Sequence, residues 1–152
     1  MELRIGLEKK LSGVLANPAL LDKALARASK AGAEGYTEAI HSWIAAGKAF
    51  TPRTGTLENS IGWRGISGRA AEVFAEAEYA PFVEFGTRAH IIRPRKRKGL
   101  RFFLKGKDEE ARVIYHPGTR PRPFFFINMS RRTLLVTRAM EEVLGEVLGL
   151  EE

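Results

Sequence analysis

A chain of 152 residues is long enough to fold around one hydrophobic core, so we expect a single domain spanning residues 1–152. The absence of cysteine excludes disulfides, thiolate zinc sites and thiol catalysis. No apolar run approaches the roughly 18 residues that cross a bilayer, and the first residues lack a signal peptide's apolar core. We therefore expect a soluble, unexported protein without membrane contact.

The net charge of +7 is unevenly distributed along the chain. Residues 1–84 hold 10 Lys/Arg and 10 Asp/Glu, residues 85–140 hold 15 and 3, and residues 141–152 hold none and 5. The second zone therefore carries +12 and the third −5. This zoning indicates contact with nucleic acid or with acidic neighbours, including another copy of the chain.

A long amphipathic helix is predicted from Asn17 to about Gly47. Asn17 suits the N-cap and Pro18 the first helical position. Gly32 interrupts the apolar face and indicates a close packing contact there. Residues 1–16 permit a short strand followed by a helical turn. The apolar face is formed by Leu21, Leu25, Ala28, Tyr36, Ala39 and Trp43.

Two hairpins follow. After a loop at 50–58, strands are predicted at 60–64 and 71–78, and at 100–104 and 112–115. Acidic residues alternate with apolar ones in the strand at 71–78, which predicts one solvated face. Phe74 breaks this alternation, so it is a candidate interface residue or an isolated exposed aromatic.

A last helix is predicted from Pro123, with an apolar stripe that includes Met129, Val136 and Met140. The fold class is therefore α+β. It comprises a long N-terminal helix, an antiparallel sheet of two hairpins with a one-turn helix between them, and a C-terminal helix.

The one-turn helix is predicted from residues 79–87. Pro81 suits its start and Gly86 its left-handed end. Glu84 is its acidic residue, a candidate for an ion pair with an adjacent copy or within the chain. The aromatic and apolar side chains available for burial are Tyr79, Phe82, Val83 and Phe85.

The second motif spans residues 116–125. His116 opens it, and Pro117 and Gly118 suit the central positions of a type II turn. Phe124, Phe125 and Phe126 cannot all face one way on a helix. At least one should point out of the core, and Phe124 and Phe125 are candidate interface anchors.

No catalytic residue is predicted. The histidines His41, His90 and His116 have no carboxylate near them at metal-ligand spacing, and structural or surface roles are expected for them. Residues 65–68 fall one residue short of the Gly-x-Ser-x-Gly motif, and no phosphate-binding loop exists. The acids at 108–110 suit a solvated hairpin tip. We therefore expect no metal and no cofactor.

A basic run without acids occupies residues 88–101. Such dense like charge repels itself, so a mobile basic loop is expected at about 87–99 until an acidic partner orders it. The candidate partners are DNA phosphates or an acidic protein surface, and a solvated loop is the alternative. The absence of aromatics there argues against base stacking. Its cations are Arg88, Arg93, Arg95, Lys96, Arg97, Lys98 and Arg101.

The order of these motifs resembles the neck or tail-completion family of long-tailed bacteriophages. Thr-Gly-x-Leu-x-x-Ser-Ile at 54–61 is followed by the 79–87 motif, a basic stretch, His-Pro-Gly-Thr and a proline-aromatic helix start. The resemblance covers roughly residues 19–145. The basic run is richer in charge than the family pattern requires.

The resemblance implies a structural virion protein of the phage neck and no enzymatic activity. Six copies would form a ring that joins the head connector or stopper to the tail tube around the DNA channel, after assembly in the host cytoplasm. Contact with channel DNA would be non-specific. Two alternatives remain open: a free-standing basic nucleic-acid-binding protein, and a metal-independent toxin-type ribonuclease that depends on His116 or His90.

Overall fold

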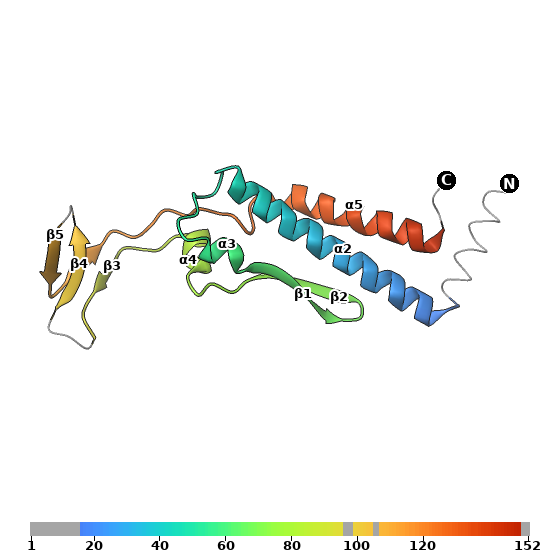
Figure 1. Ribbon diagram of the computed structural model, residues 1–152, viewed down its shortest axis with the longest axis horizontal. Helices are drawn as coiled ribbons and strands as arrows, with labels where there is room; N and C mark the ends of the chain where they lie inside the picture. Colours follow the sequence, from blue (N-terminus) through green and yellow to red (C-terminus); the bar gives the residue numbers. More distant parts are fainter. Residues whose placement is uncertain (1–15, 96–98, 105–106, 150–152) are drawn as a thin grey trace. The chain divides into compact units, whose positions relative to one another are not determined.

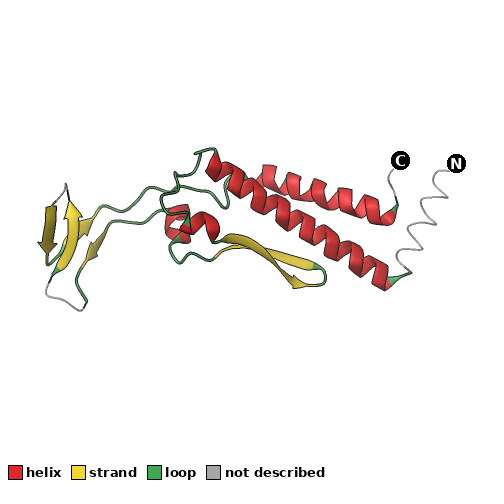
Figure 2. Cartoon of the chain, viewed as in Figure 1, coloured by secondary structure: helices red, strands yellow, loops and turns green. Residues whose placement is uncertain are grey.

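The computed structural model describes residues 16–95, 99–104 and 107–149, drawn in Figure 1 and coloured by secondary structure in Figure 2. In chain order the elements are α2 (Pro18–Ala45), α3 (Thr56–Asn59), β1 (Ile61–Ser67), β2 (Ala70–Ala75), α4 (Ala80–Phe85), β3 (His90–Ile92), β4 (Leu100–Leu104), β5 (Lys107–Ala111), β6 (Ile114–His116) and α5 (Met129–Leu148). This confirms the α+β class. The strand and turn expected within residues 1–16 lie almost wholly outside the described residues.

The chain divides by its contacts into two compact units. Unit 1 contains the described residues up to Glu78 together with those from Phe124 onward, and unit 2 is Tyr79–Pro123. The prediction of one domain stays a prediction.

In unit 1, α2 packs against α5 and against the β1–β2 hairpin, as Figure 1 shows. Small side chains on α2 let α5 approach closely: a Cβ on Gly32 would lie 3.0 Å from Val136 Cγ1 and 3.1 Å from Met140 Cγ. The close packing predicted at Gly32 is therefore confirmed. The core of unit 1 contains Ala24, Ala28, Ala33, Tyr36, Ile40, Ile44, Leu57, Ile61 and Phe124.

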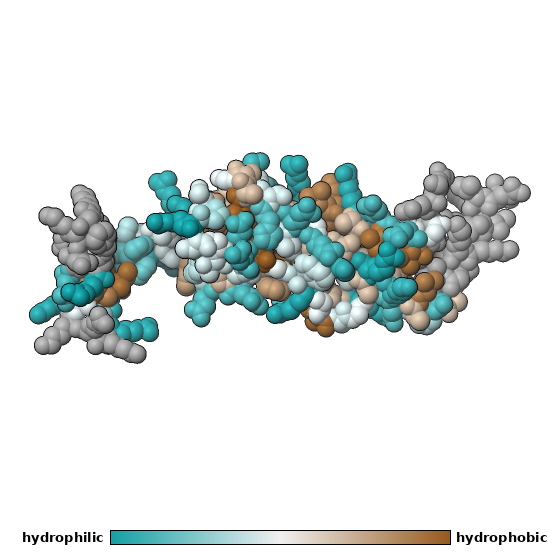
Figure 3. Space-filling model, viewed as in Figure 1, coloured by the Kyte–Doolittle hydropathy of each residue, from teal (hydrophilic) through white to brown (hydrophobic). Residues whose placement is uncertain are grey.

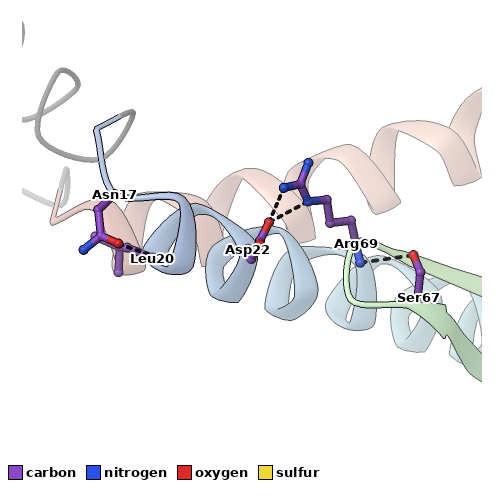
Figure 4. A network of polar contacts seen from close by, with 5 residues as sticks. All are labelled: Asn17, Leu20, Asp22, Ser67 and Arg69. Carbon is purple, nitrogen blue, oxygen red and sulfur yellow. Dashed lines mark hydrogen bonds and ion pairs between the residues drawn. The ribbon is translucent and has the colours of Figure 1, made fainter.

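Polar contacts at the start of α2 fix its first turn and the tip of the hairpin (Figure 4). The Asn17 side-chain oxygen accepts a hydrogen bond from the backbone N–H of Leu20 at 3.2 Å, which confirms the predicted N-cap. Arg69 Nε donates to Asp22 Oδ1 at 2.6 Å, so the hairpin turn is tied to α2. This ion pair is exposed and contributes little free energy of folding.

The first hairpin is present, but its turn comes later than predicted. β1 runs to Ser67, which pairs with Ala70, and the register shifts between Gly65 and Ser67. Residues 76–78 lie outside β2. One helical turn, α3, occupies part of the loop predicted at 50–58, after Gly55 at a φ of +72°.

Two further predictions about elements are wrong. The strand β4 pairs with β5 and not with residues 112–115, which lie partly in β6 and pair with β3. The acids at 108–110 are therefore strand residues, and Glu110 stands opposite Arg101, a favourable cross-strand charge pair. The described strands form three separate two-stranded sheets.

The last helix begins at Met129 and not at Pro123. Asn128 has a positive φ of 54°, which interrupts any helix running through it. The expected mobile loop at about 87–99 contains β3 and a β-bridge at Thr87, while Lys96, Arg97 and Lys98 lie outside the described residues.

Candidate functional site

The first motif forms the helical turn that its sequence predicts. α4 has proline in its first turn, and Gly86, which follows α4, has the expected positive φ of +70°. Its ψ of −177° is extended, so the predicted left-handed helical conformation is not formed. Burial differs from the expectation, because Tyr79, Phe82 and Phe85 are 43%, 58% and 64% exposed. The buried residues of α4 are Ala80 and Glu84.

Glu84 is only 5% exposed, which contradicts the expectation of a surface carboxylate available for an exposed ion pair. Its pairing, with a neighbouring copy or within the chain, stays a prediction. The exposed face of the motif is instead aromatic.

The second motif also has the predicted turn geometry at its glycine. Gly118 has a φ of +88°, a value that suits the third position of a type II turn. Its N–H donates to His116 Nδ1 at 3.0 Å, so this histidine holds the turn. His116 also stacks on His90 across the β3–β6 pair, with ring centroids 4.9 Å apart.

The fold brings the two motifs together within unit 2. Thr87 and Thr119 form a β-bridge, and the backbone N–H of Arg122 donates to the Val83 carbonyl oxygen at 2.8 Å. A Cβ on Gly86 would collide with the Thr119 carbonyl oxygen and lie 2.8 Å from Pro121 N. We call residues 86–88 and 118–121, which hold each other in this way, the glycine clasp.

Exposed basic side chains lie on both segments of the glycine clasp and beside them in the chain. Arg88 and Arg120 belong to the clasp itself, and Arg93, Arg95 and Arg122 follow its two segments. Arg101 is exposed in β4. Among the described residues, no ion pair is formed by any of these arginines. Arg101 stands opposite Glu110, whereas the charges of Arg88, Arg93, Arg95, Arg120 and Arg122 stay available to an acidic partner.

The three consecutive phenylalanines occupy three different environments. Phe124 is 1% exposed and meets Phe50 edge-on at 5.7 Å, so it is a core residue and the interface prediction for it is wrong. Phe125 is half-buried against Tyr36. Phe126 is 50% exposed and points outward, as at least one of the three must.

Phe74 is half-buried and is not an isolated exposed ring. The guanidinium of Arg64 lies over it at 4.8 Å from the ring centroid, and Arg64 also pairs with Glu72 at 3.0 Å. This cover comes from its own hairpin, so Phe74 has a partner within the chain.

Sequence reasoning missed one buried polar residue, Arg132. It is 4% exposed, and its Nη1 donates to the carbonyl oxygen of Phe124 at 2.8 Å and to that of Phe125. Tyr36 Oη donates to the same Phe125 oxygen at 2.8 Å. The aromatic run is thus held as a turn by α2 and α5, which explains why the helix starts after it. The sequence signal for this buried arginine is its position shortly after the phenylalanine run.

Within the described residues, no group of three or more histidine, aspartate or glutamate side chains is arranged to hold a metal ion. None of the helices in this part of the chain is long and apolar enough to cross a membrane. The two motifs therefore offer hydrogen-bonding groups and positive charge for binding a partner.

Comparison with known proteins gives one match. No curated protein and no solved structure matches the chain significantly. A family model described as "Bacteriophage HK97-gp10, putative tail-component" matches residues 7–86, which is more than half of the 152-residue chain and ends at Gly86, the first glycine of the clasp. The chain belongs to the HK97-gp10-like family of bacteriophage tail components.

Proposed function

We propose that this chain is a structural subunit of the phage neck, a tail-completion or terminator protein. Six copies close into a ring that joins the head connector or stopper to the tail tube around the DNA channel. The observation that carries this proposal is the match of residues 7–86 to a family of phage tail components. The subunit's place is in the virion, after assembly in the host cytoplasm.

A closed ring needs a heterologous interface, in which different patches of adjacent copies meet. The uneven charge of this chain supplies such patches, with a zone of +12 at residues 85–140 and one of −5 at residues 141–152. Each contact with a neighbouring copy is small, and the connector and tube add further contacts. The isolated chain is therefore expected to be monomeric at low concentration.

The exposed arginines of unit 2 support a contact with DNA in the channel. Arg88, Arg93 and Arg95 lie within eight positions of one another and pair with no carboxylate in the described part of the chain. Phosphate contacts made by such side chains are blind to sequence and weaken with salt. DNA of any sequence must move through the channel, so contacts with it have to be independent of sequence.

A ribonuclease function is less well supported by the positions of His90 and His116. His90 Nδ1 donates to the Arg88 carbonyl oxygen at 2.8 Å, and His116 Nδ1 accepts from Gly118. Each ring therefore uses Nδ1 to hold backbone, and the rings stack with an interplanar angle of 28°. Two stacked rings do not flank a phosphate as an acid and a base would.

Imaging of the assembled particle tests the neck assignment. We expect density for a ring of this chain on the axis between head and tail. A single copy, or a position away from that axis, would show that the assignment is wrong. Incubation of the pure chain with RNA, DNA and nucleotides tests the absence of catalysis, and turnover that is lost in His116→Ala would support the ribonuclease alternative.

A further inference from the structure

A groove lies in unit 1 between the end of α2 and the start of α5. Its volume is about 480 Å³, and its lining includes Trp43 and Lys48 on one side and Arg131, Arg132 and Leu135 on the other. Lys48 and Arg131 are exposed, and Glu38 is the acidic residue of the rim. We call this the α5 groove.

The start of α5 is unusual for a helix N-terminus. The N-cap residue Asn128 makes no side-chain hydrogen bond to the helix, and the first turn contains no acid. The first backbone N–H groups of a helix have no partner inside it and favour negative charge. Here they are followed by two arginines, Arg131 and Arg132, so positive charge accumulates where a helix is best stabilised by an anion.

Arg132 provides the second, independent sign of an anion site. Its side chain is nine-tenths buried, and its Nη2 has no hydrogen-bond partner. Its Nη1 is held by neutral carbonyl oxygens, and no carboxylate in the described part of the chain pairs with it. A buried guanidinium without a counter-charge raises the attraction for an anion at the adjacent surface.

The indole of Trp43 also has a buried N–H donor without a hydrogen-bond acceptor. This donor is Nε1, and Lys48 lies over the ring at 5.0 Å from the centroid. Lys48 is exposed, so its flexible side chain can move aside for an incoming group. Cations and unpaired donors therefore line both walls of the groove.

We propose that the α5 groove binds a carboxylate of a second copy of this chain, supplied by Glu141 or Glu142. This inference rests on the proposed ring. Both glutamates are exposed on α5, and neither forms an ion pair among the described residues, whereas Glu146 pairs with Arg27 and Glu72 with Arg64. Glu38, Glu58 and Glu78 of unit 1 also form no described ion pair, but Glu141 and Glu142 are adjacent exposed acids on one helix, so charge complementarity favours this double carboxylate.

The positions of donor and acceptor suit head-to-tail assembly. The groove lies at the first turn of α5, and the two glutamates follow more than two turns later on the same helix. Each copy therefore offers a carboxylate at one place and receives one at another, as a heterologous interface requires. Apolar contact with the neighbouring copy comes from Leu134 and Leu135, which are 50% and 44% exposed. Figure 3 shows further hydrophobic residues exposed among hydrophilic ones.

Two full-length variants separate the partners of this contact. The receptor variant carries Glu141→Gln, Glu142→Gln and Trp63→Phe, so that Trp43 is its single tryptophan. The donor variant carries Lys48→Gln and Arg131→Gln, and it also carries Trp43→Phe and Trp63→Phe so that it contains no tryptophan. Arg132 is kept in both because it holds the Phe124–Phe125 turn. Equal melting temperatures of both variants and the parent establish that they fold.

Titration of receptor with donor should change Trp43 emission saturably at a stoichiometry of one to one. Adding Glu141→Gln and Glu142→Gln to the donor, or Lys48→Gln and Arg131→Gln to the receptor, should weaken binding by about tenfold or more. Binding that is unaffected by these changes, absent at about millimolar concentration, or matched by inorganic phosphate would overturn the inference.

The two proposals fail separately. If the parent forms rings and the donor variant also does, the groove is not the interface but the ring proposal stands. If receptor and donor bind while the parent forms open filaments, the carboxylate contact stands and the closed ring is wrong.

Discussion

Thr87 and Thr119 exchange backbone hydrogen bonds of 3.0 and 3.1 Å, and their hydroxyl oxygens lie 3.1 Å apart. This pairing holds the two strands of the glycine clasp together. A Cβ on Gly118 would collide with the Thr87 carbonyl oxygen, just as one on Gly86 would collide with that of Thr119. Both glycines are thus required by backbone approach as well as by positive φ.

Replacing Gly86 with valine should destabilise the clasp by about 2 kcal/mol or more, because the Cβ meets backbone and the φ of +70° is strained for a β-branched residue. Thermal melting and hydrogen exchange at the Thr87 and Thr119 amides measure the effect. Gly65→Ala is the control, since nothing lies within 4 Å of its Cβ. A Gly86→Val chain with unchanged melting and exchange would show that the clasp is not rigid.

Two glycines of α2 allow a matched test of helix packing. Gly35→Ala should raise stability by about 0.5–1 kcal/mol, because its Cβ meets nothing within 4 Å and alanine favours helix. Gly32→Ala gains the same propensity but brings its Cβ within 3.0 Å of Val136 Cγ1. Denaturant unfolding should therefore show Gly32→Ala less stable than Gly35→Ala by about 1 kcal/mol or more. Equal stabilities would mean that α5 shifts freely.

The carbonyl oxygen of Phe125 accepts from both Tyr36 and Arg132, so the two donors should be coupled. Tyr36→Phe alone should cost about 0.5–1.5 kcal/mol, since Arg132 still satisfies this oxygen. With Arg132→Met added, the carbonyl loses both of these donors. A double-mutant cycle by denaturant unfolding should show non-additivity of about 1 kcal/mol. Strict additivity would show that the two hydrogen bonds act independently.

Local signals predicted the elements whose cause lies within a few residues. Asn17 and Pro18 mark the start of α2, and Gly86 and Gly118 mark positive φ, because capping and turn chemistry act over one turn. The gap in the apolar face at Gly32 also predicted close packing correctly.

Errors arose where distant residues decide the outcome. Phe124 resembles an interface anchor in sequence, but Phe50 and Arg132 place it in the core. The apolar residues at 113–115 favoured a hairpin partner for β4, yet pairing with β3 competes for them. The buried charge of Arg132 and the groove beside it depend on the packing of α2 against α5, which no single segment specifies.

The exposed arginines of the basic stretch should contribute to DNA binding and not to the stability of the fold. Changing Arg88, Arg93 and Arg95 to glutamine should leave the melting temperature nearly unchanged, because each is exposed and no ion pair of the described residues includes them. Binding of duplex DNA by assembled rings should weaken, and the slope of log affinity against log salt should fall by up to about three units.

The matched control removes three exposed cations elsewhere, Lys23, Arg53 and Arg138, and so lowers net charge equally. If DNA affinity follows net charge alone, the two triple variants weaken together, and the basic stretch has no special part in the contact. If only the Arg88, Arg93 and Arg95 variant weakens, position matters, and these side chains face the DNA. Particle assembly that proceeds normally with either variant would limit their role to DNA passage and exclude it from joining head to tail.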